Sequence, residues 1–466
     1  MNSKKNAVRS SDKPIPRISS KTAKNDPSQR VHFIGIGGIG MSSLARWFLA
    51  QNWLVTGSDA SKSSITQELT KDGVRLKIGH KKENLSHKTD LVVASAAIPL
   101  DNPEMEAAKE RGIKIQRYSE ALGEVTKKYK TIAICGSHGK STTTAMVASI
   151  LIKAKMDPTV IIGTKLNGWN FRYGKSEWLV IEADEYTGAF WNYHPAYAVC
   201  TNIDLEHLDF YKDLNAVKNS FKKFLQKVPK SGAVVMNRDD KNSLDVSQNI
   251  KNINPIFFSI KKKKRIEKLR SILKVPGNHN VTNALAAWHI AEEIGVPQTT
   301  ILSSLSAYKG IWRRLEYKGK NPNGIIIFDD YAHHPTEVKA SLKAIKDKYP
   351  KKHILTVFQP HQSKRLIALY DDFIKSFGDA DSVILIDVYN PKGRDTASLK
   401  INSDSLARDI NKYSASQKAV CVGSHKNVKK EIDKMVKKRM ISPSKTVAVF
   451  MGAGDLSDEI PKLIKK

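Results

Sequence analysis

Short apolar segments alternate along the chain with longer segments of mixed polarity. Segments such as 91–95 and 382–386 carry Val, Ile and Leu at successive positions, as do strands that a parallel sheet buries on both faces. Between them, apolar residues such as Leu44, Ala45 and Phe48 have the spacing of an amphipathic helix. The alternation predicts an α/β protein. The predicted strands are 31–36, 53–57, 91–95, 113–115, 132–135, 178–181, 197–202, 232–237, 324–328, 353–357, 382–386 and 446–450, and residues 280–295 are predicted to be helical.

The predicted strands fall into three groups, so we expect three α/β domains with mostly parallel sheets. They are expected over residues 30–125, 126–308 and 309–466, and 466 residues suffice for three cores. Residues 1–29 hold Lys, Ser, Pro and Asn without an apolar stretch. This composition predicts a disordered basic tail and not a signal peptide.

The overall composition is that of a soluble globular protein. Hydrophobic residues make up 40% of the chain, and no apolar run approaches the roughly 18 residues of a membrane span. Cys135, Cys200 and Cys421 lack metal-type spacing, and we interpret them as small hydrophobic residues in a reducing compartment. We therefore expect a cytoplasmic protein without a membrane partner.

The formal net charge of +31 suggests nucleic-acid binding as a hypothesis. Lysines occur along the whole length, however, with higher density only at 261–265 and 429–439, where no aromatic residues are interleaved. We interpret the charge as a solvated lysine-rich surface that favours anionic substrates, and we expect no nucleic-acid partner.

The apolar run 132–135 leads into the sequence GSHGKS at 136–141 and then a threonine-rich stretch. Glycines let backbone N–H groups approach phosphate oxygens, Lys140 can reach the terminal phosphates, and the Ser141 hydroxyl can bind Mg²⁺. Two residues separate the glycines, whereas four separate them in the common GxxxxGK[ST] loop. The segment predicts a polyphosphate site, and a strand-to-helix turn with an incidental lysine is the simpler alternative.

A second glycine-rich motif, GIGGIG at 35–40, lies between a predicted strand and a predicted helix. The next strand ends at Asp59, 19 residues after Gly40. This arrangement is typical of dinucleotide-binding folds, in which the acid contacts a ribose hydroxyl. Because a separate phosphate loop follows about 100 residues later, we expect the chain to bind two different phosphate-bearing ligands.

Acids and a histidine follow two strands of the second predicted domain. Strand 178–181 ends in EADE at 182–185, and strand 197–202 is followed by DLEHLD at 204–209. Ligands bind at the carboxyl ends of parallel strands, and carboxylate oxygens suit Mg²⁺. We select Glu182 and His207 as candidate functional residues, although single acids in loops are usually only solvated.

Two further polar clusters follow. The segment GNHNVTN at 277–283 places Asn283 one turn inside a helix, as a candidate contact to a purine edge, whereas helix capping explains Asn278 or Asn280. The strand 324–328 is followed by DDYAHHPTE at 329–337. His333 and His334 in this segment have helix capping as an alternative role.

Together these motifs resemble those of the Mur ligase family, over residues 30–466. GSHGKST, EADE, EHLD, the segment 277–283 and Arg314 occur in the family's order. The resemblance implies a Rossmann-like N-terminal domain, a central P-loop ATPase domain and a Rossmann-like C-terminal domain. Within the family, the segments 35–42, 329–337 and 358–361 are similar to those of members that add L-alanine to UDP-N-acetylmuramate.

The resemblance implies an ATP- and Mg²⁺-dependent ligase that adds L-alanine to UDP-N-acetylmuramate through an acyl phosphate, in peptidoglycan precursor synthesis. The implied catalytic residues are Lys140, Glu182, His207 and Arg314, and the implied metal ligands are Ser141, Glu182 and His207. The implied ATP-binding residues are Gly136, Ser137, His138, Gly139, Lys140, Ser141, Thr142, His279, Asn283, Arg314 and Asp330. The implied UDP-substrate residues are Gly37, Gly38, Ile39, Gly40, Met41, Asp59 and His80. Tyr331, His334 and Arg365 are implied for the incoming amino acid or the UDP-substrate.

Some positions depart from the alanine-adding pattern. The family's DHMDxY is EHLDFY here, Gln362 replaces a common arginine, and Tyr186 resembles the ligase that recycles murein tripeptide. Three alternatives stay open: that tripeptide ligase, a nicotinamide oxidoreductase built on GxGxxG, and a basic nucleic-acid-binding NTPase. The acceptor and the oligomeric state, monomer or homodimer, also stay open.

Overall fold

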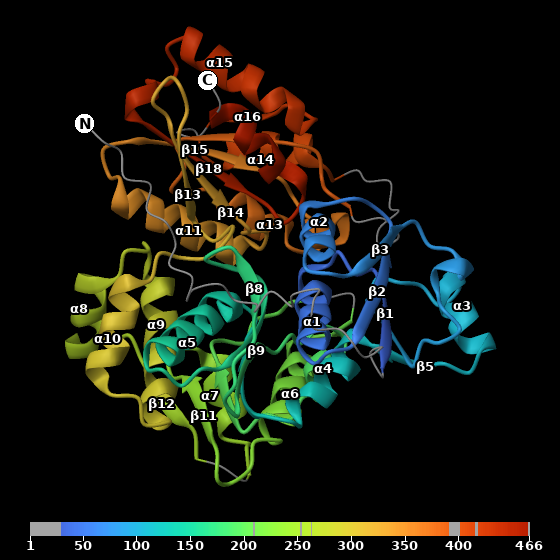
Figure 1. Cartoon of the computed structure of the whole chain (residues 1–466). Helices are drawn as coiled ribbons and strands as arrows, with labels where there is room; N and C mark the ends of the chain where they lie inside the picture. The colour runs from blue at the N-terminus through green and yellow to red at the C-terminus, as the bar shows by residue number, and fades with distance from the viewer. Residues whose placement is uncertain are drawn as a thin grey trace, which may run out of the picture. The chain divides into compact units, whose positions relative to one another are not determined.

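The computed structural model describes residues 29–207, 210–251, 254–261, 263–390, 401–414 and 418–464. The chain divides into two compact units, one of residues up to 265 together with 283–305, the other of 266–282 and 306–466 (Figure 1). The basic tail expected at 1–29 lies outside the described residues except for Gln29.

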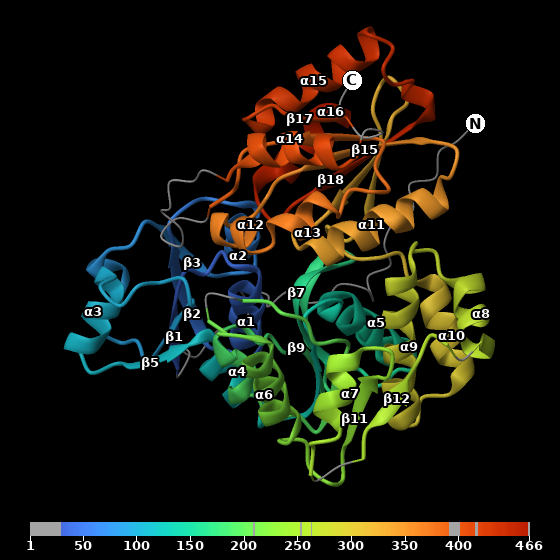
Figure 2. The same cartoon turned by 180° about the vertical axis from the view of Figure 1, so that it is seen from behind.

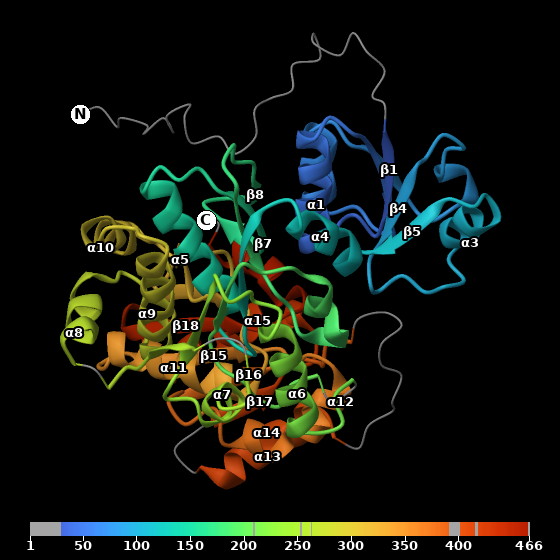
Figure 3. The same ribbon diagram turned by 90° about the horizontal axis from the view of Figure 1, so that it is seen from below.

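The first unit begins with a five-stranded sheet in the order β3-β2-β1-β4-β5, with every neighbouring pair parallel. Figure 3 shows α1 and α4 on one side of this sheet and α3 on the other. Phe33 accordingly packs with α1, while Val92 packs with Met105 of α3. Because both faces of the sheet are buried, the sequences of its central strands are continuous apolar runs. The elements are β1 (Arg30–Ile34), α1 (Ile39–Ala50), β2 (Leu54–Asp59), α2 (Ser64–Lys71), β3 (Arg75–Ile78), η2 (Lys82–Asn84), β4 (Leu91–Ala94), α3 (Pro103–Glu110), β5 (Lys114–Arg117) and α4 (Tyr118–Thr126).

A seven-stranded sheet follows in the order β12-β11-β10-β6-β9-β7-β8, parallel except for the β7–β8 hairpin. Because β9 and β10 flank β6, the segments that follow these three strands meet at one edge of the sheet. The elements are β6 (Lys130–Cys135), α5 (Lys140–Lys153), β7 (Thr159–Leu166), β8 (Trp169–Arg172), β9 (Trp178–Glu182), η3 (Tyr186–Asn192), β10 (Tyr197–Cys200), α6 (Leu214–Leu225), β11 (Ala233–Asn237), α7 (Lys241–Ser247), β12 (Ile256–Phe258), α9 (Asn278–Glu293) and α10 (Gln298–Ala307). The helix α8 (Lys263–Ile272) from Ile266 on, and α9 up to Thr282, belong to the second unit.

The second unit contains a six-stranded sheet in the order β13-β14-β18-β15-β16-β17, parallel except for β13. Successive residues of β18 enter different cores: Val447 and Val449 pack with α11, and Ala448 and Phe450 with α15, on the opposite side of the sheet (Figure 2). The elements are β13 (Glu316–Lys320), β14 (Ile326–Asp330), α11 (Pro335–Lys348), β15 (His353–Phe358), α12 (Ser363–Ala368), α13 (Tyr370–Ile374), β16 (Ser382–Leu385), α14 (Ser403–Tyr413), β17 (Lys418–Cys421), η4 (His425–Asn427), α15 (Val428–Lys437), η5 (Pro443–Lys445), β18 (Thr446–Met451), η6 (Asp455–Glu459) and α16 (Ile460–Ile464).

The predicted α/β class with three mostly parallel sheets is confirmed, and the predicted strands recur with small shifts of their ends. The pattern missed several edge strands, such as β3 and β13. Polar and exposed positions interrupt these strands, so they lack a continuous apolar run. The domain boundaries stay predictions. In the described part of the chain, no helix is long and apolar enough to cross a bilayer.

Candidate functional site

The segment between β6 and α5 forms a tight loop whose two glycines have no room for a side chain. Gly136 and Gly139 have φ values of 133° and 83°, which favour glycine. A Cβ atom on Gly136 would collide with Thr201 Oγ1, and one on Gly139 would collide with Asn283 Oδ1. The loop is therefore fitted against β10 and α9. Asn283, predicted to contact a purine edge, lies against this phosphate loop.

The ammonium group of Lys140 is surrounded by oxygen atoms. Its Nζ donates to Gly136 O at 2.6 Å and to Glu185 Oε1 and Oε2 at 3.0 and 2.9 Å. Burial alone would lower the pKa of Lys140, but the charges of Glu185 and Asp184 outweigh it and raise that pKa. The lysine is therefore charged at neutral pH, in a loop suited to phosphate.

Glu185 is at the centre of this site, although sequence analysis did not select it. Its side chain is 1% exposed, and its Oε1 lies 3.2 Å from His207 Nε2. Burial alone would raise the pKa of Glu185, but the charge of Lys140 and the hydrogen bond with His207 lower it to about 2. Burial lowers the pKa of His207, and the hydrogen bond with Glu185 outweighs this effect and raises it. Lys140 and Glu185 thus form a charged cluster, to which His207 is hydrogen-bonded.

The chain holds His207 in a strained conformation. Its φ is 57°, in a region that residues with side chains rarely adopt. The Tyr186 ring lies against the imidazole with a centroid distance of 4.8 Å. Tyr211 Oη donates to Glu185 O at 2.5 Å. Strain maintained by several contacts is a feature of functional sites.

Ser141 and Glu182, two of the three predicted metal ligands, lie together. Ser141 Oγ donates to Glu182 Oε2 at 2.9 Å, and Glu182 Oε1 accepts from Gly163 N at 2.8 Å. Hydroxyl and carboxylate oxygens are the hard ligands that Mg²⁺ prefers, so this pair fits the predicted cofactor. His207 belongs to a neighbouring group with Asp184 and Glu185, whose ligand atoms all lie within 4.8 Å of one another.

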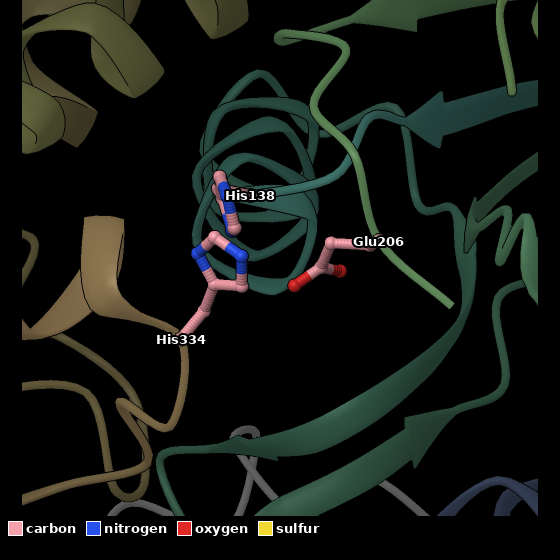
Figure 4. A group of neighbouring side chains, drawn as sticks. All are labelled: His138, Glu206 and His334. Atoms are coloured by element: carbon pink, nitrogen blue, oxygen red, sulfur yellow. The ribbon is translucent and has the colours of Figure 1, made fainter. Parts of the chain in front are cut away.

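Two further polar residues of the first unit lie at the same edge of the sheet. Figure 4 labels His138, from the phosphate loop, and Glu206, from the segment after β10. His138 Nε2 lies 3.2 Å from Asp204 Oδ2. Glu206 is 9% exposed, and its Oε2 lies 3.8 Å from His207 Nε2. Acidic side chains thus face the phosphate loop from the β10 side as well.

The second glycine-rich loop, residues 35–40, is fixed by Asp59. Asp59 Oδ2 accepts from Gly37 N at 2.8 Å, and its Oδ1 accepts from Ser61 N at 3.2 Å. His80 follows β3 at the same edge, with its Nδ1 3.0 Å from Ser58 Oγ. The predicted UDP-substrate residues on these segments are therefore near one another. Met41, also predicted there, is a core residue with 4% exposure.

In the second unit, Arg314 pairs with the first turn of α11. Its Nη1 donates to Glu337 Oε1 at 3.2 Å, and its guanidinium lies 5.4 Å from the centroid of the Tyr331 ring. Burial, together with the charge of Arg314, lowers the pKa of His279 to about 4. Burial raises the pKa of Asp330 to about 6. His279 is therefore uncharged at neutral pH.

His334 adopts the capping role that sequence analysis left as an alternative. Its Nδ1 accepts from Thr336 N at 3.3 Å, and Glu337 Oε2 accepts from His334 N at 3.4 Å. Arg365 lies on α12, with its Nη1 3.3 Å from His361 Nδ1. The His361 ring stacks on Tyr389 at 5.6 Å.

Sequence analysis missed Glu185 and Asn202 as contributors to the site. Asn202 Oδ1 accepts from His138 N at 2.9 Å and so shapes the phosphate loop. Glu185 stands in the same EADE segment as Glu182, which was the available signal. Its pairing with Lys140 depends on the turn after β9, which periodicity does not predict.

A phosphate loop at the central strand of one parallel sheet, with a second glycine-rich loop on another, defines a multidomain nucleotide-binding α/β protein. Three family models match in succession: the Mur ligase family catalytic domain at residues 30–130, the Mur ligase middle domain at 134–291, and the Mur ligase glutamate ligase domain at 313–454. The chain belongs to the Mur ligase family.

Known proteins resemble the chain over most of its length. A UDP-N-acetylmuramate–L-alanine ligase of Clostridium novyi is 44% identical over 395 residues, covering 80% of this chain and 85% of the relative. The enzyme of that name from Clostridium perfringens is 38% identical and covers 92% and 96%. The crystal structure of UDP-N-acetylmuramate-alanine ligase from Thermotoga maritima matches with a TM-score of 0.75 and 27% identity, covering 93% of this chain and 98% of that one.

Proposed function

We propose that this chain is an ATP-dependent ligase that joins L-alanine to UDP-N-acetylmuramate in peptidoglycan precursor synthesis. The observation that carries the proposal is the charged Lys140 inside the phosphate loop, held by Glu185 and adjacent to the Ser141–Glu182 pair. The names of the two clostridial relatives support the substrates and do not favour the alternative of a ligase that recycles murein tripeptide.

In the first step, a lactyl carboxylate oxygen attacks the γ-phosphorus of ATP, the bond to the β–γ bridging oxygen breaks, and ADP leaves. Lys140 neutralises charge on the β- and γ-phosphates, which replace Glu185 as the partner of its ammonium group. Catalysis of phosphoryl transfer rests mainly on positioning and on stabilisation of such charge. Backbone N–H groups of the loop 136–142 hold the phosphates.

Ser141 and Glu182 would hold Mg²⁺, and His207 would bind a Mg²⁺ near the γ-phosphate and the substrate carboxylate. When bound, the ion neutralises phosphate charge and orients the transferring group. Glu185 keeps Lys140 charged and orients His207 before the nucleotide arrives. This preorganisation avoids a rearrangement during the reaction.

In the second step, the amino group of L-alanine attacks the acyl carbon, phosphate leaves, and the nitrogen loses a proton to give the amide. Arg365, with Tyr331 and His334, is proposed to recognise the amino acid or the UDP-substrate. His279, Arg314, Asp330 and Asn283 are proposed to contact ATP.

The first sheet is proposed to bind the uridine diphosphate end through the loop 37–41, Asp59 and His80. We further propose that the protein acts in the cytoplasm, where ATP is available. Cys135, Cys200 and Cys421 are free thiols, as a reducing compartment would keep them.

The direct test is ADP release from ATP and Mg²⁺ with UDP-N-acetylmuramate and each amino acid in turn, with murein tripeptide as a separate acceptor. Turnover with L-alanine, and a product heavier than UDP-N-acetylmuramate by one alanyl residue, are expected. Turnover with tripeptide alone would reject L-alanine as the acceptor. Hydrolysis that needs neither UDP-N-acetylmuramate nor an acceptor would reject the ligase.

A further inference from the structure

A completely buried carboxylate lies behind the proposed uridine site. Glu104, in the first turn of α3, has a side-chain exposure of 0%. Its Oε2 accepts from Ser58 Oγ at 2.5 Å and lies 3.1 Å from His32 Nε2. No role in the proposed reaction has been given to it, yet a buried carboxylate is costly unless its oxygens are satisfied.

Glu104 also holds the segment that carries His80. Its Oε1 accepts from Lys81 N at 3.2 Å and from Asn84 Nδ2 at 2.6 Å, and Asn84 Nδ2 also donates to Gly79 O at 2.9 Å. The turn 79–84 is therefore wrapped around one carboxyl group. This group connects the end of β2, the segment after β3 and the start of α3.

Glu104 is ionised at neutral pH. Burial alone would raise the pKa of Glu104, but hydrogen bonds from His32, Ser58 and Asn84 outweigh it and lower that pKa. The helix N-terminus favours the negative charge as well. An ionised carboxylate can only accept, so the single hydrogen of Ser58 Oγ points to Glu104.

The direction of the hydrogen bond from Ser58 to Glu104 determines which ring nitrogen of His80 carries the proton. His80 Nδ1 lies 3.0 Å from Ser58 Oγ and 3.6 Å from Glu104 Oε1, and Ser58 has already given its hydrogen to Glu104. Ser58 must therefore accept, and His80 Nδ1 must carry the proton. In a neutral imidazole the opposite nitrogen, Nε2, is then an acceptor.

We propose that Glu104 is a positioning residue of the uridine-nucleotide site, which acts through Ser58 to present His80 Nε2 as a hydrogen-bond acceptor. The matching ligand group is an N–H or O–H donor of uridine, either the imide or a ribose hydroxyl. This inference rests on the proposed function, because it assigns a partner for His80 in the UDP-substrate site.

Glu104→Gln in the full-length chain breaks this hydrogen-bond relay from Glu104 through Ser58 to His80, with little change in side-chain volume. Lys81 N and Asn84 Nδ2 both donate, so the amide oxygen of the new side chain must face them and its NH2 group must face Ser58 Oγ. Ser58 can then turn its hydrogen towards His80 Nδ1 and move the imidazole proton to Nε2. Two donors would then face each other at the uridine. We expect UDP-N-acetylmuramate to bind about tenfold more weakly, with the KM for ATP unchanged within about twofold.

Nitrogen-15 NMR of the ligand-free chain at pH 8 tests the relay without any substrate. The wild type should carry the His80 proton on Nδ1, and Glu104→Gln should move it to Nε2. Glu106→Gln is the matched control, because Glu106 lies on the same helix and is 46% exposed. It should leave both the tautomer and the affinity unchanged. A wild-type His80 with its proton on Nε2 would overturn the inference.

Calorimetric titration separates this inference from the proposed function. If the wild type does not bind UDP-N-acetylmuramate, the proposed function fails, whatever the NMR result. If the wild type binds and Glu104→Gln binds equally well, only the positioning role fails. In a His80→Ala background, Glu104→Gln should weaken the binding of UDP-N-acetylmuramate further by less than about twofold, because its effect passes through His80.

Two further probes complete the test. Should Glu104→Gln fail to fold, Ser58→Ala removes the same relay, and binding equal to the wild type would then refute it. CDP lacks the imide N–H, and 2′-deoxy-UDP and 3′-deoxy-UDP each lack one of the two ribose hydroxyls. If an analogue binds equally weakly to the wild type and to Glu104→Gln, the group that it lacks is the donor to His80. If Glu104→Gln weakens the binding of every analogue by the full tenfold, the donor is not a group of uridine.

Discussion

The two glycine-rich loops of the first unit share a backbone plan and differ in charge. Each follows a central strand of a parallel sheet and leads into a helix, at Ile39 and at Lys140. In the loop 35–40 the fixing contact is from Gly37 N to Asp59, between a backbone donor and a carboxylate. In the loop 136–141, Lys140 lies inside the loop and pairs with Glu185 from the segment that follows the neighbouring strand β9.

This difference separates binding from chemistry. A loop of backbone donors can hold a diphosphate that does not react. Phosphoryl transfer also requires a positive charge and metal ligands where charge develops. Of the two loops, only the loop 136–141 has the residues proposed for these roles, Lys140 and the Ser141–Glu182 pair. A glycine-rich strand-to-helix turn therefore indicates a phosphate site, and the residues on neighbouring strands decide whether it is catalytic.

The largest expected effect is from Lys140→Ala. Removing a group directed at developing charge costs about 10²–10³ in rate, so kcat for ADP formation should fall by at least that factor. UDP-N-acetylmuramate should bind as before, because its loop has no part in the change. Lys130→Ala, which removes a lysine that is 54% exposed, is the matched control. Wild-type kcat in a folded Lys140→Ala protein would contradict the assignment.

Glu185→Gln tests the charged cluster through stability. The folded pKa of about 2 lies below an unfolded value of about 4.3, so Glu185 stabilises the fold above pH ~4.3, and this contribution is lost as the pH falls towards 2. The difference corresponds to about 3 kcal/mol. Urea unfolding at pH 7 should show the variant less stable by up to that amount, and at pH 2.5 most of the gap should vanish. If the difference in free energy of unfolding between the two proteins does not depend on pH, the pairing with Lys140 and His207 does not lower the pKa of Glu185.

The third prediction concerns the acceptor, which is proposed to bind at neither loop. Arg365→Ala should raise the KM for L-alanine about 10- to 150-fold, the effect of losing a charge-assisted hydrogen bond, and should change the KM for ATP far less. Gln362→Ala, three residues earlier, should have only a mild effect because a neutral amide offers less to a carboxylate. Equal effects on both substrates would leave Arg365 as a structural residue.

Apolar periodicity predicted the central strands well because both faces of each sheet are buried, as in β18. It could not predict edge strands such as β3, where exposed polar side chains hide the pattern. The phosphate loop could be predicted because its glycines and Lys140 are close together in the sequence. The roles of Glu185 and Glu104 could not be predicted, because each depends on partners from other parts of the sequence that only the folded chain brings together.

The central claim is that the two loops bind different ligands, and one calorimetric comparison tests it directly. UDP-N-acetylmuramate, ATP with Mg²⁺ and NADH are titrated into the full-length wild type and Asp59→Asn. Asp59→Asn should weaken the binding of UDP-N-acetylmuramate at least tenfold, because the amide has one acceptor oxygen for the two donors Gly37 N and Ser61 N, and it should leave ATP binding unchanged within about twofold. Tight NADH binding by the wild type without binding of UDP-N-acetylmuramate, or equal losses for both nucleotides in Asp59→Asn, would contradict the division between the two loops.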